Sequence, residues 1–322
     1  MMEMFVKIRK AGITLVWLVT SLMYAGAQSY SYKPVKGFSD ETNAQLEAFF
    51  DSTVPMKIRK VAVFDCDGTL FGQVPYYLAD EALYEFAQKN YTGKSDKKSK
   101  EKMAIVDKLL HGNNVGVEYV QNRIQFLSGL TPEEIAEIGH VMFQEKYQNK
   151  MYPEMKQLLA NLKDYGFEIW IVTASPEFLY EKFCAEQLGI PQERILGVKS
   201  LVTADGVTTG QLVYPVPQDN GKAEVVNTFI KTKPLFAGGN SRGDMELMNT
   251  SVGLKLIVNP DDKKVEKEMG NKTVKQYWDN DPRAITVYCN DVPEGDYQYV
   301  TGEWGVKKNA ANAKTDKIVI GY

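Results

Sequence analysis

Short apolar runs alternate with helix-like stretches through most of the chain. Residues 61–64 form an uninterrupted apolar run that leads into Asp65, which is typical of a strand buried on both faces. Gly166 and Gly189 mark the expected ends of two helices that lie between such runs. Further strands are expected at residues 167–172, 195–202, 211–216, 235–238 and 253–258. The alternation predicts an α/β fold, with a Rossmann-like, doubly wound parallel sheet and helices on both faces.

The pattern is different between residues 73 and 150, where apolar residues recur at helical spacing throughout. Thr131, Pro132 and Glu134 provide an N-cap, a first-turn proline and a capping box, and Ser175 with Pro176 predicts another helix start. A basic run at residues 94–102 is expected to be an exposed turn between two helices. We expect residues 73–150 to form a helical cap at the carboxyl edge of the sheet, where open α/β folds bind ligands.

The N-terminal residues have the features of an export signal. A basic segment is followed by an apolar run at residues 13–24 and by Ala25-Gly26-Ala27, an A-x-A cleavage site. The apolar run is shorter than the roughly 20 residues that a transmembrane helix needs. We expect cleavage near Ala27 and a periplasmic or secreted protein whose mature chain has no membrane span, with an uncleaved N-terminal anchor as the alternative.

Composition narrows the possible chemistry. The chain has 322 residues, 44% hydrophobic and 25% charged, which is typical of globular proteins and excludes collagen-like, coiled-coil and disordered classes. A net charge of −3 argues against nucleic acid as a partner. Two histidines and three cysteines leave little room for histidine-rich metal centres or a disulfide framework. Any chemistry must therefore depend mainly on carboxylates, Lys, Ser and Thr, and Cys66 is expected to be buried and inert.

Four polar motifs follow predicted strands or begin a predicted helix. They are Asp65-Cys66-Asp67-Gly68-Thr69-Leu70, Thr173, Lys222, and Gly239-Asn240-Ser241-Arg242-Gly243-Asp244. Two carboxylates in an extended turn can act on a phosphorus atom and on its leaving oxygen. A Lys and a hydroxyl from neighbouring elements can neutralise a phosphoryl group. Nearby carboxyl and amide oxygens make a site suited to Mg²⁺.

These motifs, in this order, resemble those of the haloacid dehalogenase superfamily, and the resemblance covers about residues 58–262. It implies that Asp65 is the nucleophile, which forms an aspartyl-phosphate, and that Asp67 is the general acid and then the base. The resemblance further implies a Mg²⁺-dependent phosphatase that acts on a small-molecule phosphomonoester. The residues implied to bind phosphate are Gly68 and Thr69 through backbone N–H groups, Thr173, Ala174 and Lys222. The implied metal site consists of Asp65, the Asp67 carbonyl, Asn240 and Asp244.

Departures from the family pattern limit what can be said of metal and substrate. Asn240 stands where phosphatases of the superfamily usually have Asp, so either Asn240 or Asp244 is the direct ligand. The cap resembles that of the phosphoserine phosphatase-like branch, in which an Arg at the position of Arg123 binds the substrate carboxylate. That branch also has a Glu where this chain has Val74, which weakens a strict phosphoserine assignment. Tyr76 and Tyr77 could instead recognise a quaternary ammonium, as in phosphorylcholine, or could simply pack the cap.

The expected organisation has four parts. Residues 1–27 are the signal peptide, 28–72 and 151–262 the α/β core, 73–150 the cap, and 263–322 an extension with no assigned role. The leading hypothesis is a phosphoric monoester hydrolase for a phosphoserine-like or phosphorylcholine-like compound. The alternative is a binding protein that retains the fold and has weakened catalysis. The pairing of Cys184 and Cys289 and the oligomeric state stay open.

Overall fold

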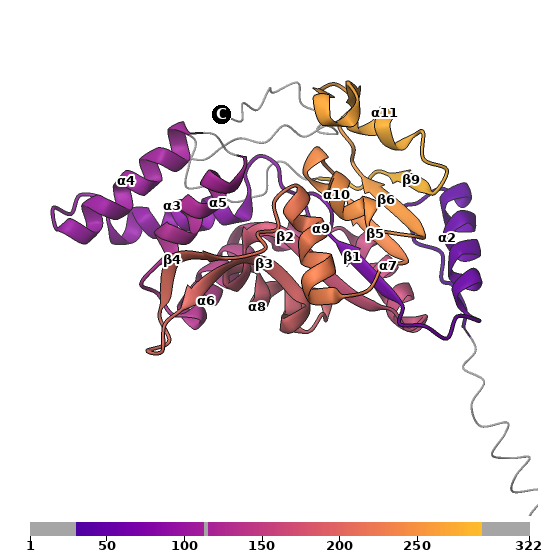
Figure 1. Cartoon of the computed structure of the whole chain (residues 1–322), viewed down its shortest axis with the longest axis horizontal. Helices are drawn as coiled ribbons and strands as arrows, with labels where there is room; N and C mark the ends of the chain where they lie inside the picture. The colour runs from indigo at the N-terminus through magenta and orange to yellow at the C-terminus, as the bar shows by residue number, and fades with distance from the viewer. Residues whose placement is uncertain (1–29, 113–114, 292–322) are drawn as a thin grey trace, which may run out of the picture. The chain divides into compact units, whose positions relative to one another are not determined.

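A seven-stranded sheet, with helices packed on it, forms the centre of the fold (Figure 1). The computed structural model describes residues 30–112 and 115–291, and the sheet and helices belong to the unit that begins at Pro34. The expected signal peptide and its cleavage site at Ala27 lie outside the described residues. Among the residues described, no helix combines the length and the apolar character needed to cross a bilayer.

The strand order is β4-β3-β2-β1-β5-β6-β9, and only β4 is antiparallel to its neighbour. The fold class is therefore confirmed as α/β with a mostly parallel sheet. In the sheet, β1 has β2 on one side and β5 on the other, so the strand order reverses at β1. The topological switch point therefore lies at the carboxyl end of β1. The strand bounds are β1 Val61–Phe64, β2 Glu168–Pro176, β3 Ile195–Val202, β4 Thr208–Val213, β5 Phe236–Gly239, β6 Leu254–Val258 and β9 Ala284–Val287; β7 (Val265–Glu266) and β8 (Lys272–Thr273) form a separate pair.

Both faces of the sheet are covered. Successive side chains of each strand point to opposite faces, so each face has its own buried residues. Val61 and Val63 share a buried cluster with Leu247 and Trp278. On another side of the core, Phe236 contacts the ring of Phe49, with ring centroids 5.6 Å apart. The helices of the core are α2 Asp40–Thr53, α7 Pro153–Asp164, α8 Glu177–Leu188, α9 Asn220–Val225, α10 Met245–Asn249 and α11 Val274–Trp278, with short helical turns at 143–147, 148–150, 192–194, 226–230, 242–244 and 267–269.

In the described part of residues 73–150, four α-helices and the two short helical turns at 143–150 make up the predicted all-helical insert. The α-helices are α3 Leu78–Asn90, α4 Lys97–His111, α5 Val117–Leu127 and α6 Pro132–Met142. The capping box of Thr131 and Glu134 is present as predicted. The N–H of Gly129 donates to the carbonyl of Thr208 at 2.9 Å, so the β3–β4 hairpin supports the end of α5.

The prediction of an exposed turn at residues 94–102 was wrong from Lys97 onward, because α4 begins there. The Lys102 side chain is buried, and its Nζ donates to the carbonyls of Gln125, Phe126 and Ser128 at 3.0, 2.6 and 2.8 Å. These carbonyls lie at the C-terminal end of α5, where helix carbonyls lack partners within the helix. Lys102 therefore joins α4 to α5 inside the cap.

Two further differences concern the sheet. The predicted strand at 211–216 lies at Thr208–Val213 instead, because Pro215 has no N–H to extend the pairing. Strand β9 comes from the range 263–322, to which the sequence assigned no role, and it pairs with β6 at the sheet edge. Trp278, from the same range, is buried in the core. Part of the C-terminal extension thus completes the sheet.

Candidate active site

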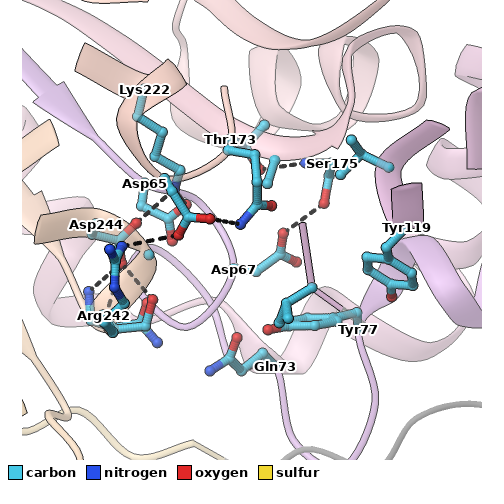
Figure 2. Close-up of a pocket in the computed structure, with 18 of the residues that line it drawn as sticks. Asp65, Asp67, Gln73, Tyr77, Tyr119, Thr173, Ser175, Lys222, Arg242 and Asp244 are labelled. Carbon is cyan, nitrogen blue, oxygen red and sulfur yellow. Dashed lines mark hydrogen bonds and ion pairs between the residues drawn. The ribbon is translucent and has the colours of Figure 1, made fainter. Parts of the chain in front are cut away.

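A cavity of about 420 Å³ lies where β1, β2 and β5 end (Figure 2). The structure brings together most of the residues that the sequence singled out. Those in the cavity lining are Asp65, Asp67, Tyr77, Arg123, Thr173, Ala174, Lys222, Asn240 and Asp244. The carboxyl ends of parallel strands meet at one edge of the sheet, which explains why motifs so far apart in sequence converge here.

Asp65 directly follows β1, and its backbone N–H donates to the carbonyl of Gly238 at 3.0 Å, which continues the pairing with β5. Its carboxylate accepts from the hydroxyl of Thr69 at 3.1 Å and from Nζ of Lys222 at 2.6 Å. Burial, together with the nearby charge of Asp244, raises the pKa of Asp65 to about 7 despite the Lys222 contact. The Asp65 carboxyl group is therefore held in place by hydrogen bonds, while Lys222 does not fully compensate its negative charge.

Lys222 lies between two carboxylates, one directly after β1 and one in the helical turn 242–244 that follows β5. Its Nζ is 2.6 Å from Oδ1 of Asp65 and 2.6 Å from Oδ1 of Asp244. Burial by itself would lower the pKa of Lys222, but the two carboxylates outweigh burial and raise it, so the ammonium stays charged. The other oxygen of Asp244 accepts from the N–H groups of Asn240 and Ser241 at 3.0 and 2.9 Å and from the Ser241 hydroxyl at 3.0 Å.

Asp67 is oriented by two hydroxyl groups that the sequence did not assign to the site. Tyr180 donates to Oδ1 at 2.7 Å and Ser175 donates to Oδ2 at 3.0 Å. Burial raises the pKa of Asp67, and these two hydrogen bonds oppose that rise only in part. A carboxyl group whose pKa is raised in this way is suited to carry a proton for transfer.

The prediction that Ser175 caps a helix was wrong, because β2 continues to Pro176 and α8 begins at Glu177 without a side-chain cap. Ser175 contacts Asp67 instead. Its position two residues after Thr173, at the end of a predicted strand, is a signal that could have indicated a role in the site. Tyr180 gave no such signal, since its contact depends on how α8 packs against the loop after β1.

The N–H groups of the turn after β1 form hydrogen bonds within the turn itself. Gly68 has φ +79°, a conformation that favours glycine, and its N–H donates to Phe71 at 2.8 Å. The N–H of Thr69 donates to the carbonyl of Cys66 at 3.2 Å. Because the turn engages both N–H groups, we do not assign them a phosphate contact. Thr69 contributes instead through its hydroxyl, which holds Asp65.

Cys66 is buried within this turn, as expected. Its Sγ lies 3.7 Å from Sγ of Cys184 on α8, and both thiols are free. Tyr180 lies on the same helix, so α8 contacts the turn at two places, once through a thiol and once through a phenol. Helix α8 therefore supports the turn that carries both candidate catalytic aspartates.

An oxygen-only set of possible metal ligands surrounds Asp65. In the described part of the chain, no three His, Cys, Asp or Glu side chains converge as metal ligands. Amide and backbone oxygens are further possible ligands. Asn240 supplies such an oxygen, which accepts only a long 3.4 Å contact from Thr69. Asp244 has both oxygens engaged and orients Lys222 and the Asn240 loop. The donor types and the incompletely neutralised charge at Asp65 fit Mg²⁺.

The cap contributes a second buried ionic group. Nη2 and Nε of Arg123 lie 2.7 and 3.1 Å from Oδ1 of Asp80, and Tyr119 donates to both Asp80 oxygens at 2.7 Å. In Figure 2, Tyr77 and Tyr119 lie beyond Asp67 on the side away from Lys222. Tyr76, in contrast, is buried outside the described cavity lining, and its carbonyl accepts from Tyr147. Of the two tyrosines that the sequence proposed, only Tyr77 borders the cavity.

The mouth of the cavity carries residues that the sequence did not predict. Arg242 lies 3.0 Å from Asp219 and 3.1 Å from Glu246. Gln73 and Gln218 add uncharged polar groups to the lining. Arg242 stands inside the fourth motif, so its proximity could have been inferred. The glutamines lie in loops without a distinctive pattern.

Comparisons with known proteins agree with this arrangement. Residues 62–249, more than half of the chain, match the model of the haloacid dehalogenase-like hydrolase family. Phosphoserine phosphatase SerB1 of Mycobacterium tuberculosis is 24% identical over 219 residues, which cover 66% of this chain and 68% of that protein.

Two solved structures resemble the fold. A conserved protein of unknown function from Anaerococcus prevotii has a TM-score of 0.60 at 14% identity, and the match covers 84% of this chain and all of that one. A protein of unknown function from Bordetella pertussis has a TM-score of 0.51 at 17% identity, covering 64% of this chain and 92% of that one. At these identities the two structures support the fold alone.

Proposed function

Because the chain belongs to the haloacid dehalogenase-like hydrolase family, we propose that it is a Mg²⁺-dependent phosphomonoester hydrolase that forms an aspartyl-phosphate at Asp65. The observation that carries the proposal is the arrangement of three groups. Lys222 lies 2.6 Å from the Asp65 carboxylate, and Asp67 is held in the same cavity by Ser175 and Tyr180. A nucleophile, a charge-neutralising ammonium and a proton donor are thus side by side.

The proposed reaction has two steps. The Asp65 carboxylate attacks phosphorus, the bond to the leaving oxygen breaks, and Asp67 gives that oxygen its proton. Asp67, now a carboxylate, takes a proton from a water molecule that attacks the phosphorus, and Asp65 is released with inorganic phosphate. Lys222 neutralises charge on the phosphoryl oxygens throughout. Thr173 lies in the cavity lining and is placed to donate to the same oxygens.

Asp65, the Asp67 carbonyl and Asn240 are the residues that would hold Mg²⁺. When bound, Mg²⁺ would neutralise negative charge on the phosphoryl group and on Asp65. Asp244 would act through Lys222 and through the Asn240 loop rather than as a direct ligand, because its oxygens already accept four hydrogen bonds. A carboxylate offers about four lone-pair sites.

The relative named phosphoserine phosphatase supports phosphate-ester hydrolysis among the reactions of the family. A cavity of about 420 Å³ fits a small organic phosphate. The competing function is that of a binding protein with weakened catalysis. It is motivated by Asn240, which would supply an uncharged oxygen to the metal where a carboxylate is usual.

Hydrolysis of 4-nitrophenyl phosphate tests the proposal. We expect activity that requires Mg²⁺, stops with EDTA, and falls by at least about 10³-fold in Asp65→Asn. Asp51→Asn, a change of the same kind in α2, serves as the control and should leave activity unchanged. A wild-type protein that binds Mg²⁺ but hydrolyses no phosphate ester would favour the binding-protein function instead.

We further propose that the protein is exported after cleavage near Ala27, on the basis of the basic segment, the apolar run and the A-x-A site. Mass spectrometry of protein from the extracytoplasmic fraction should show Gln28 as the first residue. An intact Met1 would contradict cleavage and would favour the anchor.

A further inference from the structure

Arg123 and Tyr119 border the cavity on its cap side, and Asp80 lies behind them, fully buried. We propose that this arrangement selects phosphomonoesters of an uncharged, hydroxyl-bearing alcohol over esters whose alcohol carries a carboxylate or an ammonium. The inference rests on the phosphomonoesterase function proposed above and names its substrate class. It departs from both substrates that the sequence suggested.

A substrate carboxylate would meet an arginine whose charge is already balanced. The Arg123 guanidinium donates twice to Oδ1 of Asp80, and the side chains of Arg123 and Asp80 are 3% and 0% exposed. A buried ion pair of this geometry has a net charge of zero. Adding a carboxylate would bury a second negative charge beside Asp80, without a new cation to offset its desolvation.

A substrate ammonium would meet a different obstacle. The aromatic faces that could attract it are already close to a cation, because the Arg123 guanidinium carbon lies 4.1 Å from the ring centroid of Tyr119 and 5.8 Å from that of Tyr77. A second cation on these rings would be repelled by Arg123 at short range. Asp80 offers no compensation, because both of its oxygens accept from Tyr119 and one also accepts from Arg123.

The charged residues at the mouth are paired as well. Arg242 is 3.0 Å from Asp219 and 3.8 Å from Glu268, and Lys264 is 2.8 Å from Glu266. Together with Arg123, these residues give the lining three cations and three carboxylates outside the phosphoryl site. The lining outside the phosphoryl site therefore has little net charge to attract a charged alcohol.

Uncharged hydrogen-bonding groups remain for the leaving group. Nη1 of Arg123 has no hydrogen-bond partner in the described part of the chain, although the residue borders the cavity. The side chains of Gln73 and Gln218 also line it. Amide and guanidinium N–H groups donate well to hydroxyl oxygens. An alcohol with further hydroxyl groups, such as a glycerol-like or sugar-like one, matches these donors.

The first test uses the wild-type protein and three esters of similar size. We expect kcat/KM for glycerol 1-phosphate to exceed the values for 3-phosphoglycerate and phosphoethanolamine by about tenfold or more, a factor that corresponds to about 1.4 kcal/mol. Equal values, or a higher value for either charged ester, would overturn the inference. Hydrolysis of 4-nitrophenyl phosphate is measured alongside, and its absence would instead count against the proposed function itself.

The second test changes the charge balance. Asp80→Asn keeps the side-chain volume and leaves Arg123 without its counter-charge. We expect kcat/KM for 3-phosphoglycerate to rise about tenfold, while the value for glycerol 1-phosphate changes less than threefold. Glu85→Gln is the matched control, because Glu85 also lies in α3 and pairs with Lys146 at 2.7 Å, away from the cavity lining.

Melting curves of both variants show whether they fold. A folded Asp80→Asn protein whose preference is unchanged would contradict the role of Asp80. If Asp80→Asn does not fold, the comparison of the three esters with the wild-type protein decides whether the inference holds.

Discussion

Two buried ionic clusters face the same cavity and differ in their charge balance. The core cluster, Asp65, Lys222 and Asp244, has two carboxyl groups around one ammonium, with Asp67 close by. The cap cluster, Asp80 and Arg123 with the Tyr119 hydroxyl, has one carboxylate and one guanidinium. The first retains negative charge for a metal ion to neutralise, whereas the second is balanced. Two buried ionic clusters can therefore share one cavity and differ in charge balance, the one with the proposed catalytic role and the one in the cap.

The clusters also differ in which secondary-structure elements carry their residues. In the core cluster, Asp65 follows β1 and pairs with Lys222 of α9, which is 157 positions away in sequence. The cap cluster joins two helices of a single insert, 43 positions apart. The core cluster therefore depends on the packing of distant parts of the chain, whereas the cap cluster depends on one insert. Four measurements test whether the two clusters differ in this way.

The largest effect is expected for Lys222→Met. The change leaves two buried carboxyl groups without their cation and removes charge neutralisation from the phosphoryl group. We expect kcat for 4-nitrophenyl phosphate to fall by about 10²- to 10³-fold, and stability to fall by about 3–5 kcal/mol. Steady-state kinetics and urea denaturation measure the two effects.

Lys182→Met is the control for this variant. Lys182 pairs with Glu137 on the surface, so its loss should cost no more than about 1 kcal/mol. Unchanged kcat in Lys222→Met would show that Lys222 is only structural.

Arg123→Met should separate stability from catalysis. It leaves Asp80 buried without a counter-charge, and we expect a loss of about 3–5 kcal/mol, as for the core lysine. Because the 4-nitrophenyl group needs no contact with the cap, kcat for its ester should fall by less than about tenfold. A drop in kcat as large as that of Lys222→Met would contradict the division between the two clusters.

Tyr180→Phe tests the hydroxyl that positions Asp67. Removing it takes away one hydrogen bond, about 1 kcal/mol, and loosens the proton donor. We expect kcat/KM to fall about tenfold for glycerol 1-phosphate, whose leaving oxygen needs a proton, and by less than about twofold for 4-nitrophenyl phosphate, whose leaving group does not. A merely structural role would lower both values equally.

Tyr147→Phe provides the comparison for Tyr180. Its hydroxyl donates to the Tyr76 carbonyl at 3.0 Å, outside the cavity lining, so the ratio of the two substrates should stay as in the wild type.

The smallest effect concerns Lys102, which joins α4 to the C-terminal end of α5. Burial lowers the pKa of Lys102 to about 8, below the value of about 10.4 expected in the unfolded chain. Between these values the unfolded chain binds more protons, so this group makes the free energy of unfolding rise with pH. Urea denaturation at pH 7.5 and pH 10 should show a more positive change in the wild type than in Lys102→Met. The same change in both proteins would contradict the lowered pKa.

Local pattern was enough to predict the α/β fold and the helical insert, and the motifs predicted which residues gather at the cavity. Apolar runs such as 61–64 indicate buried strands, and carboxyl ends of parallel strands necessarily share an edge. Asp65, Lys222 and Asp244 could therefore be placed together without coordinates.

Packing decided the rest, because contacts between side chains on different elements leave no periodic trace in the sequence. Tyr180 reaches Asp67 only through the packing of α8, and Asp80 reaches Arg123 only because α3 and α5 lie side by side. Lys102 looked like part of a solvated basic run, yet three helix-end carbonyls surround its ammonium. The residue types and their order along the chain were enough to predict which residues can do the chemistry. Tertiary structure decided which charges are already balanced, because burial makes that balance depend on every neighbour within a few ångströms.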